Sequence, residues 1–293
     1  MLAPHRNPIH SEFGEILCHN EHPCEQYILR VMAPECAAIA EPGQFAHIRV
    51  TPERPMRRPL SILRAAPEEG WVEFLYKVVG EGTALLAGRQ PGEILDLLGP
   101  IGRPFQPHPE RTRQLLVGGG VGIPPMIFLA ERILEREEGS PVVFMGSEIP
   151  FPFLTTESIL PVPGISEETN LAMQLMEDLG IPSRLASGVP QPAVHCGYVT
   201  ELARDWLSAQ HPAHLEEIEV FACGPHPMLE AVAELAREFG VPCQVSLEEF
   251  MACGVGGCAG CAVPVQTPEG PAMKRVCVDG PVFMADEVFG GDI

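Results

Sequence analysis

Three cysteines lie within nine residues near the carboxyl end of the chain, and their spacing constrains the fold more than any other feature. The stretch CGVGGCAGC runs from Cys253 to Cys261 through Cys258, and Cys277 follows after fifteen intervening residues. This C-x4-C-x2-C-x15-C pattern is the plant-ferredoxin spacing for a 2Fe–2S cluster, whose fourth ligand comes from further along the chain. Structural zinc sites commonly pair two C-x-x-C knuckles, and only one is present here. The spacing favours the cluster, with zinc and unliganded thiols as alternatives.

The glycines between these cysteines support the same interpretation. Gly254, Gly256, Gly257 and Gly260 remove the Cβ atoms that would keep backbone amides away from the sulfurs of a cluster. The predicted metal ligands are therefore Cys253, Cys258, Cys261 and Cys277. Ten cysteines are too few for a disulfide scaffold in 293 residues. The other six are scattered, and we expect most of them to be buried small hydrophobic residues: Cys18, Cys24, Cys36, Cys196, Cys223 and Cys243.

The charge balance limits the partners that the chain can have. There are 19 Lys and Arg residues against 39 Asp and Glu residues, a net charge of −20. Such a surface repels phosphate backbones, which argues against nucleic acid or an anionic membrane as a partner. The amino terminus has no apolar stretch of signal-peptide length, and no eighteen-residue apolar run occurs. We therefore expect a cytoplasmic protein whose phosphate-bearing cofactors are held by backbone amides and a few arginines.

Residues 12 to about 105 are predicted to form a small antiparallel barrel. The stretches EQYILRVMA, QFAHIRVT and WVEFLYKVV are strand-like and are separated by turn sequences such as EPG and GEG. Within the third stretch, Val72, Phe74 and Tyr76 alternate and are expected on one face. Short strands and turns at this spacing are typical of a barrel.

From residue 113 the pattern changes to alternating strands and helices. RQLLVGGGVGIPPMIFLAERILERE is an apolar strand, a glycine loop and then a helix with Met126, Ala130, Ile133 and Leu134 on one face. SPVVFMGS and IEVFACGP are predicted strands, NLAMQLMEDLG is a predicted helix with leucines at 171, 175 and 179, and HPMLEAVAELAREFG is another helix. Such alternation predicts a parallel sheet. The proline-rich segment 149–170 is predicted to be an insertion.

Two glycine-containing loops at the ends of these strands predict a nicotinamide nucleotide site. The first supplies Gly118, Gly119, Gly120 and Gly122 before a helix, although Ile123 stands where a complete G-x-G-x-x-G motif has its third glycine. The second supplies Cys223, Gly224 and Pro225. Alone, the first loop is equally well explained as a tight turn without a ligand, but two such loops at one sheet edge favour a ligand site. Glu148, after the second strand, favours NAD over NADP because a carboxylate repels a 2′-phosphate. Cys223 is expected either against the nicotinamide or as a buried structural thiol.

The barrel carries a predicted flavin site. In MRRPLSI, Arg58 would neutralise a pyrophosphate, while Pro59 and Ser61 would set the strand edge against the flavin ring. The alternative is that Arg57 and Arg58 are two solvated arginines near a strand. The stretch GEGTALL places Gly82 and Thr83 at the start of a helix, where they predict a second anion-binding turn. The chain is thus predicted to be multi-domain: an antiparallel β-barrel FAD domain (1–110), an α/β parallel-sheet NAD domain (111–242) and a small C-terminal 2Fe–2S domain (243–293).

Taken in this order, RRPLS, GEGT, GGGVGIPP, ACGPHPM and the cysteine cluster resemble the ferredoxin–NADP reductase superfamily with a C-terminal 2Fe–2S domain. More narrowly, MACGVGGCAGCAVPV followed by KRVCVDGPVF resembles the electron-transfer subunits of NAD-linked (class 1B) dihydroorotate dehydrogenase. The resemblance covers residues 12 to 285. It is looser over 150–200, where the family usually carries a short acidic segment and this chain has LASGVPQPAVHCGYVTEL.

The resemblance implies FAD contacts from two strand segments and one turn: Arg58, Pro59, Leu60 and Ser61; Leu75, Tyr76 and Lys77; Gly82 with Thr83. It also implies a catalytic partner subunit that holds FMN and oxidises dihydroorotate to orotate in pyrimidine biosynthesis, in a heterotetramer. The expected function is electron transfer from that FMN through 2Fe–2S and FAD to NAD⁺. Hydride transfer needs no general base, so no catalytic residue is predicted. The alternatives are a small subunit of an NADH-dependent ferredoxin:NADP oxidoreductase, a self-contained oxygenase reductase, and a non-enzymatic redox sensor or zinc-stabilised binding module.

Overall fold

The structure is a computed structural model that describes residues 8–290 and divides into two compact units. Of the described residues, unit 1 contains 8–105 together with Leu247–Val282, and unit 2 contains Gln106–Ser246 together with 283–290. The cysteine cluster therefore belongs to the same unit as the amino-terminal strands. The domain boundaries at 110 and 242 remain predictions, and the predicted outer limits, residues 1 and 293, lie outside the described residues.

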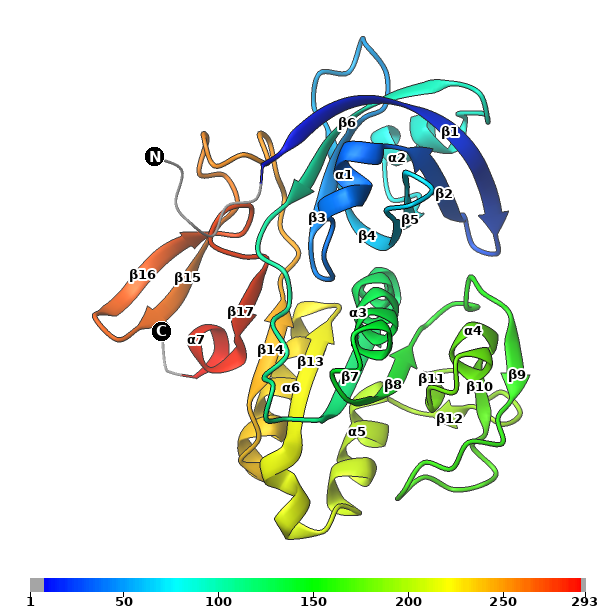
Figure 1. Ribbon diagram of the computed structural model, residues 1–293, viewed down its shortest axis with the longest axis vertical. Helices are drawn as coiled ribbons and strands as arrows, with labels where there is room; N and C mark the ends of the chain where they lie inside the picture. Colours follow the sequence, from blue (N-terminus) through cyan, green and yellow to red (C-terminus); the bar gives the residue numbers. More distant parts are fainter. Residues whose placement is uncertain (1–7, 291–293) are drawn as a thin grey trace. The chain divides into compact units, whose positions relative to one another are not determined.

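Unit 1 is built on a closed antiparallel barrel, as the strand pattern predicts (Figure 1). The strand order is β1-β2-β5-β4-β3-β6. Apolar side chains such as Ile16, Ile48 and Phe74 fill its core without exposure to solvent. The bounds are β1 (His10–His22), β2 (Gln26–Met32), α1 (Pro34–Ile39), β3 (Phe45–Arg49), β4 (Arg58–Ala66), β5 (Trp71–Lys77), α2 (Glu81–Ala87) and β6 (Ile94–Ile101).

Strand β5 does not show the one-sided burial that the alternation predicts. Val72, Phe74 and Tyr76 are buried as expected, but Glu73 on the opposite face is only 6% exposed. Arg30 of β2 pairs with Glu73 at 3.0 Å, and its guanidinium lies 3.9 Å from the centre of the Trp71 ring. This pair satisfies the carboxylate and covers the outer face of the barrel, so both faces of β5 are shielded from water.

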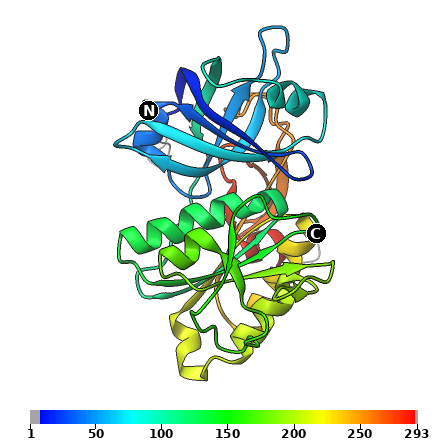
Figure 2. The same ribbon diagram turned by 90° about the vertical axis from the view of Figure 1, so that its right-hand side faces the viewer.

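Unit 2 is a seven-stranded sheet with helices on its faces (Figure 2). The strand order is β12-β11-β8-β7-β13-β14-β17, and the neighbours from β12 to β14 are parallel. The strands are β7 (Arg113–Gly119), β8 (Ser140–Gly146), β11 (Ser183–Ser187), β12 (His195–Cys196), β13 (Ile218–Cys223), β14 (Cys243–Ser246) and β17 (Val282–Met284). The helices are η1 (Gly120–Gly122), α3 (Ile123–Glu135), α4 (Gln174–Asp178), α5 (Val199–Ser208), η2 (Pro212–Glu217), α6 (His226–Phe239) and α7 (Ala285–Phe289). The multi-domain prediction of a barrel, a parallel α/β sheet and a cysteine-rich carboxyl-terminal segment is confirmed.

Two predicted details of unit 2 are wrong. The leucine spacing predicts one helix from residue 170, but Leu171–Met173 form strand β10, which pairs with β9 (Thr155–Glu157) of the proline-rich insertion. The helix that follows has only five residues. A strand partner for these residues overrides the local helical preference. On α3, Met126, Ala130 and Ile133 are buried as expected, whereas Leu134 is 39% exposed.

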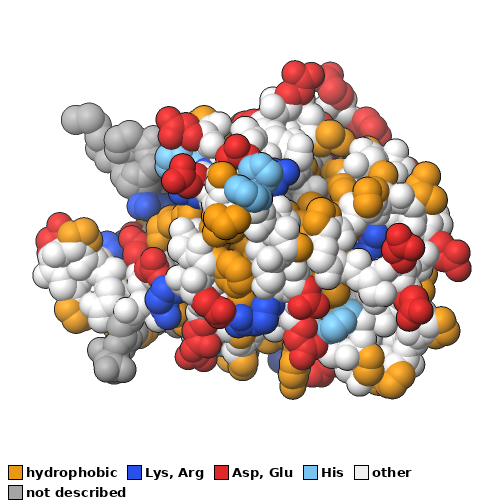
Figure 3. Space-filling model, turned by 90° about the horizontal axis from the view of Figure 1, so that it is seen from below, with side chains coloured by type: hydrophobic (Ala, Val, Ile, Leu, Met, Phe, Trp, Pro, Cys, Tyr) orange, Lys and Arg blue, Asp and Glu red, His pale blue; other side chains and the backbone are white. Residues whose placement is uncertain are grey.

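The surface matches the acidic composition. Figure 3 shows acidic side chains spread over one face among apolar and neutral groups, with Lys and Arg only in scattered positions. None of the helices within residues 8–290 has the length and the apolar character that crossing a membrane requires.

Candidate functional site: cysteine loop, arginine turn and glycine loops

The cysteine loop connects β14 to a two-stranded ribbon of β15 (Ala262–Thr267) and β16 (Gly270–Arg275). The turn after β16 carries Cys277 back to the loop. The Val276 amide donates to the Cys261 carbonyl at 3.0 Å, and the Arg275 guanidinium donates to the Gly256 carbonyl at 2.9 Å. The ribbon thus brings the distant fourth cysteine beside the other three, as the spacing predicts.

The four thiols lie in one group with their strongest interactions within two pairs. The Cys253 thiol interacts with that of Cys258, and the Cys277 thiol with that of Cys261, while Cys253 also acts on Cys277 through its charge. Within residues 8–290, no three His, Cys, Asp or Glu side chains converge as a single metal ion requires. A tetrahedral zinc site needs four ligands around one point, whereas a 2Fe–2S cluster has two irons that each take two thiolates. The paired arrangement fits the cluster better than zinc.

Backbone amides around the pairs are suited to anionic sulfur. The Gly257 amide lies 3.3 Å from Cys253 Sγ, and the Gly260 amide lies 3.4 Å from Cys258 Sγ. Burial opposes ionisation of Cys253, but the amides of Val255, Cys258 and Gly257 outweigh it and lower its pKa to about 6. Burial and the neighbouring Cys261 thiol raise the pKa of Cys277 to about 12, so this thiol would need the positive charge of iron in order to ionise. The amides directed at Cys253 and Cys258 are the feature that fits a thiolate-bound cluster.

Exposure differs across the four cysteines. Cys258 is exposed, Cys253 is half-buried, and Cys261 and Cys277 are buried.

Among the six scattered cysteines, Cys36, Cys223 and Cys243 are buried, but Cys24 and Cys196 are exposed and Cys18 is half-buried. The expectation that most of these six are buried is therefore wrong for half of them. All ten cysteines lie within the described residues, and none forms a disulfide.

The predicted flavin motifs RRPLS and GEGT meet within unit 1. The Arg58 guanidinium lies directly against Gly82, at a distance that leaves no room for a Cβ atom there. Its Nη1 donates to the Met56 carbonyl at 3.0 Å. Thr83 Oγ1 accepts hydrogen bonds from the amides of Val79 and Gly80, which fixes the turn before α2. A side chain at position 82 would push the guanidinium off the turn, so Gly82 lets the arginine and the turn form one cradle.

Arg57 and Arg58 have different surroundings. Arg57 Nη2 donates to both carboxylate oxygens of Asp96 at 2.7 Å, and its Nη1 donates to the Asp96 carbonyl at 2.8 Å. This bidentate pair ties the segment before β4 to β6. Arg57 is thus an internal tether rather than the solvated residue of the alternative interpretation. Arg58 is half-buried and donates to the nearby carbonyls of Met56 and Arg57.

The other predicted flavin positions lie on β4 and β5. Pro59 and Ser61 are half-buried and pair with His47 and Phe45 of β3. Leu60, Leu75 and Tyr76 are buried, and Lys77 is half-buried at the end of β5. The Tyr76 hydroxyl lies 2.8 Å from His19 Nε2, and its ring stacks on Tyr27 at 5.4 Å. His19 and Tyr27 were not among the predicted site residues, because pairing across strands has no local sequence signal.

The two glycine loops lie at the carboxyl ends of neighbouring strands in unit 2. Gly118 of β7 is in register with Cys223 of β13. Later strands are added to one side of β7 as far as β12, and the chain then returns to place β13 on its other side. This change of direction is the position at which open α/β sheets bind ligands. The structure therefore brings both predicted loops to one place.

Several of these glycines lie in close contact where the two loops pack, and Gly122 has the tightest contact with backbone atoms. A Cβ on Gly122 would overlap the Cys223 carbonyl, and one on Gly119 would lie 2.5 Å from the Met228 sulfur. Gly224 also contacts Met228, at the start of α6, and Gly118 packs on the Ile123 backbone. Pro225 caps α6, and Cys223 is fully buried.

Gly120 differs from the other glycines of the loop. It has a φ of +55°, and among the described residues no atom lies within 4 Å of the position of its Cβ. A left-handed backbone facing open space is where a ligand can approach most closely. Glu148, just beyond β8, is exposed, as a ribose-binding carboxylate has to be.

One buried histidine was missed by the sequence analysis. His47 of β3 has no solvent exposure and lies opposite Pro59. Burial and the neighbouring charges of Arg57 and Arg58 lower its pKa to about 4. Within residues 8–290, neither ring nitrogen has a hydrogen-bond partner. The only indication of this residue in the sequence is that a polar side chain stands inside the apolar stretch QFAHIRV.

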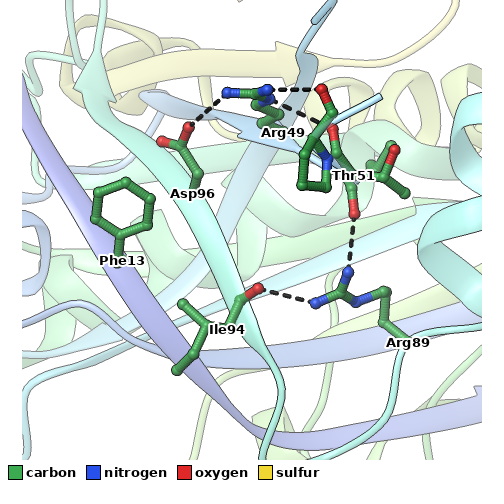
Figure 4. A pocket seen from close by; sticks show the side chains of 8 residues that line it. Phe13, Arg49, Thr51, Arg89, Ile94 and Asp96 are labelled. Carbon is green, nitrogen blue, oxygen red and sulfur yellow. Dashed lines mark hydrogen bonds and ion pairs between the residues drawn. The ribbon is translucent and has the colours of Figure 1, made fainter. Parts of the chain in front are cut away.

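A separate hollow on the barrel does not have the features of a cofactor site. It is lined by Phe13, Arg49, Arg89, Asp96 and neighbouring residues (Figure 4). Arg89 donates to the carbonyls of Val50 and Ile94, and Arg49 donates to the carbonyl of Thr51 and pairs with Asp96. Both guanidinium groups are used to fasten strand ends.

Comparisons with known proteins agree with this geometry. Residues 248–289 match the family described as the iron-sulfur cluster binding domain of dihydroorotate dehydrogenase B. The chain is 37% identical over 256 residues to a protein of Bacillus caldolyticus named dihydroorotate dehydrogenase B (NAD(+)), electron transfer subunit, covering 85% of this chain and 87% of the relative. A protein of the same name from Desulforamulus reducens is 31% identical over 264 residues, covering 89% and 92%.

Solved structures show the same architecture. The structure of an NADH-dependent reduced ferredoxin-NADP oxidoreductase, described in the context of flavin-based electron bifurcation, superposes with a TM-score of 0.74. It is 29% identical, covering 94% of this chain and 90% of that one. The ferredoxin reductase in carbazole 1,9a-dioxygenase, at 21% identity, 80% and 68% coverage and a TM-score of 0.60, shares the fold. The full-length similarity to the named relatives is decisive: this chain belongs to the family of electron transfer subunits of NAD⁺-linked dihydroorotate dehydrogenase B.

Proposed function

We propose that this chain carries electrons from the FMN of a catalytic partner subunit, through a 2Fe–2S cluster and FAD, to NAD⁺. The overall reaction is dihydroorotate plus NAD⁺ giving orotate, NADH and a proton. The strongest support is the arrangement of the four cysteines in two pairs, with a backbone amide directed at the Cys253 sulfur. These cysteines lie in the same compact unit as the flavin motifs. When bound, FAD exchanges both hydride and single electrons, so it joins a two-electron carrier to a one-electron carrier.

The residues of unit 1 would hold the flavin and the cluster. Arg58 supplies a positive charge for the FAD pyrophosphate beside Gly82 and Thr83, and the β4 segment Pro59–Ser61 with the β5 segment Leu75–Lys77 presents its edge to the flavin. The four cysteines ligate the irons. In a chain with a net charge of −20, a correctly placed arginine is needed to offset the repulsion of a pyrophosphate.

The residues of unit 2 would bind the nicotinamide nucleotide at the change of strand order. Gly118, Gly119 and Gly122 let the first loop pack on the second, formed by Cys223, Gly224 and Pro225, while Gly120 offers open backbone to the nucleotide. The exposed Glu148 favours NAD over NADP. The chain itself supplies no acid or base to the transfer, since hydride carries both electrons with the proton.

Replacing Arg58 by alanine is expected to weaken FAD binding without unfolding the barrel. Loss of a hydrogen bond to a charged group costs about 1.5–3 kcal/mol, which is roughly a 10- to 150-fold higher Kd for FAD. The measurement is FAD titration of the deflavinated protein. Arg57→Ala is the contrasting variant. Because it removes the ion pair with Asp96, it should lower the melting temperature and have a smaller effect on the affinity for FAD. Equal FAD affinity in Arg58→Ala and in the unmutated protein would contradict the assignment.

The partner subunit is proposed to dock near the exposed side of the cysteine loop. Cys258 is exposed, Val255 is 43% exposed, and Phe250, three residues before Cys253, is 96% exposed. An apolar contact beside the cluster suits single-electron transfer, because it excludes water and keeps the distance short. Aromatic side chains of this kind commonly anchor interfaces.

Phe250→Ser is therefore expected to weaken the complex with the FMN subunit at least about 10-fold, the typical effect of losing an interface anchor. The measurement is titration of the isolated subunits by surface plasmon resonance. Ile159→Ser is the matched control, because Ile159 is 92% exposed but belongs to unit 2, whereas the cysteine loop belongs to unit 1. Both variants should retain iron, FAD and NADH:dye reductase activity. A Phe250 variant that binds the partner normally contradicts this docking surface.

The function as a whole is tested with the separated subunits. Alone, this chain should show flavin and 2Fe–2S absorbance and NADH:dye reductase activity but should not oxidise dihydroorotate. Adding the FMN subunit should give dihydroorotate-dependent NADH formation. Oxidation of dihydroorotate by the isolated chain would refute the subunit assignment.

A second candidate is the small subunit of an NADH-dependent ferredoxin:NADP oxidoreductase, favoured by the superposition with such a structure over 94% of this chain. Native purification with flavin analysis separates the two: FAD together with FMN supports the dihydroorotate assignment, and FAD alone supports the second candidate.

The cytoplasmic location is part of the proposal, because ten cysteines without a disulfide are typical of a reducing compartment.

A further inference from the structure

His47 connects the predicted flavin strand to the cysteine loop. Its backbone lies on β3, where it pairs with Pro59 of the RRPLS segment. Its ring lies against Gly254, the residue after Cys253: a Cβ on Gly254 would come within 2.7 Å of His47 Nδ1. All of these residues belong to unit 1. The ring therefore occupies the space between the two predicted cofactor sites.

The ring is buried without the partners that burial requires. His47 has no exposure, and within the described part of the chain neither Nδ1 nor Nε2 has a hydrogen-bond partner. The backbones of Cys253 and Arg57 lie close enough to raise the pKa of the ring as hydrogen-bond partners would, but neither contact has the geometry of a hydrogen bond. A buried polar group without a partner costs about 1–3 kcal/mol. A histidine kept at such a position points to a partner that is not one of the described protein groups.

The neighbours of the ring indicate what that partner is. Gly254 has a φ of +66° and is buried, so the loop is turned sharply at the point where it meets the ring. The glycine leaves the side of the imidazole open towards the segment that carries Cys253. Anionic sulfur, from a thiolate or an inorganic sulfide, is the hydrogen-bond acceptor that this loop would bring there.

We propose that His47 is a positioning residue for the 2Fe–2S cluster, donating its ring N–H to a cluster sulfur and wedging the cysteine loop against the flavin strand. This inference rests on the proposed function, since it requires the cluster. A hydrogen bond to cluster sulfur stabilises the reduced form, which carries one more negative charge, and therefore raises the reduction potential. His47 thereby favours transfer of each electron onto the cluster and fixes the loop beside the strand that holds the flavin.

The test compares His47→Leu, which removes both nitrogens at similar volume, with His47→Gln, which retains a donor. The expected result for His47→Leu is a cluster whose reduction equilibrium falls about tenfold, a shift of about 59 mV to more negative potential for a one-electron couple. His47→Gln should recover part of the shift. The FAD potential, read in the same spectroelectrochemical titration, should stay unchanged. Ile48→Val, at the adjacent fully buried position of β3, is the packing control and should leave the cluster potential unchanged.

A second readout follows the nitrogen directly. Pulsed EPR of the reduced cluster, with ¹⁵N-labelled histidine, should show a nitrogen coupling that disappears in His47→Leu. Failure of His47→Leu to retain iron, while His47→Gln retains it and both bind FAD, also supports the proposal. It is overturned if both variants keep the original cluster potential and EPR spectrum, or if only the FAD potential moves. Absence of iron and sulfide from the unmutated protein would instead refute the proposed function.

Discussion

Cys277→Ser is expected to remove the cluster while leaving the flavin reductase activity in place. Cys277 reaches the other cysteines only through the β15–β16 ribbon, and it is buried in a pair with Cys261. Serine is a poor ligand for iron, so one iron would lose half of its protein ligands. Removing a group that only supports a metal ligand already costs about 10–100-fold in metal affinity or activity. We therefore expect loss of a ligand itself to lower electron transfer from the partner subunit by about 100-fold or more.

Iron and acid-labile sulfide content, and dihydroorotate-dependent NADH formation with the FMN subunit, measure this effect. NADH:dye reductase activity should remain, since it needs only FAD and NAD. Cys196→Ser is the matched control, because Cys196 is an exposed cysteine of unit 2 outside the loop. A Cys277 variant with full iron content, or a Cys196 variant that loses its iron, would show that the ligand set is wrong.

Gly122→Ala is expected to disrupt both nucleotide loops together. Its new methyl group would overlap the Cys223 carbonyl and lie 2.5 Å from the Gly224 nitrogen, and backbone atoms cannot rotate aside as a flexible side chain can. Overpacking of this kind costs about 1–3 kcal/mol. Because the loops must shift apart, we also expect the KM for NADH to rise at least about 10-fold, the equivalent of 1.4 kcal/mol of binding.

Two further glycine variants separate a loss of stability from a loss of nucleotide binding as the cause of a raised KM. Gly180 has a left-handed backbone like that of Gly120, with φ +71° and open space at its Cβ position among the described residues, but it lies beyond α4. Gly180→Ala should lower the melting temperature of unit 2 without raising the KM for NADH. Gly120→Ala should raise the KM with a stability loss no larger than that of Gly180→Ala, because its methyl group enters the proposed nucleotide site. An unchanged KM in both Gly122→Ala and Gly120→Ala contradicts the site.

The sequence was sufficient for features whose signal is local. The ligand spacing of Cys253, Cys258 and Cys261 is set within nine residues, so a loop around a cluster can be recognised without any tertiary information. The strand–glycine–helix segment around Gly120 is equally local, and β7, η1 and α3 follow its pattern. The prediction of a helix at Leu171 is wrong because its strand partner, Glu157, lies fourteen residues away. That partner is in a proline-rich segment whose sequence does not indicate a strand.

By itself, the sequence determined the cluster type, the order of barrel, parallel sheet and cysteine loop, and the family, because each depends on residues close together along the chain. Only the tertiary structure decided that Arg57 is a tether to Asp96 while Arg58 lies on Gly82, and that His47 is buried without a partner against Gly254. The physical reason is that burial and hydrogen bonding depend on which distant strands and loops meet. A single polar residue in an apolar strand does not specify what faces it.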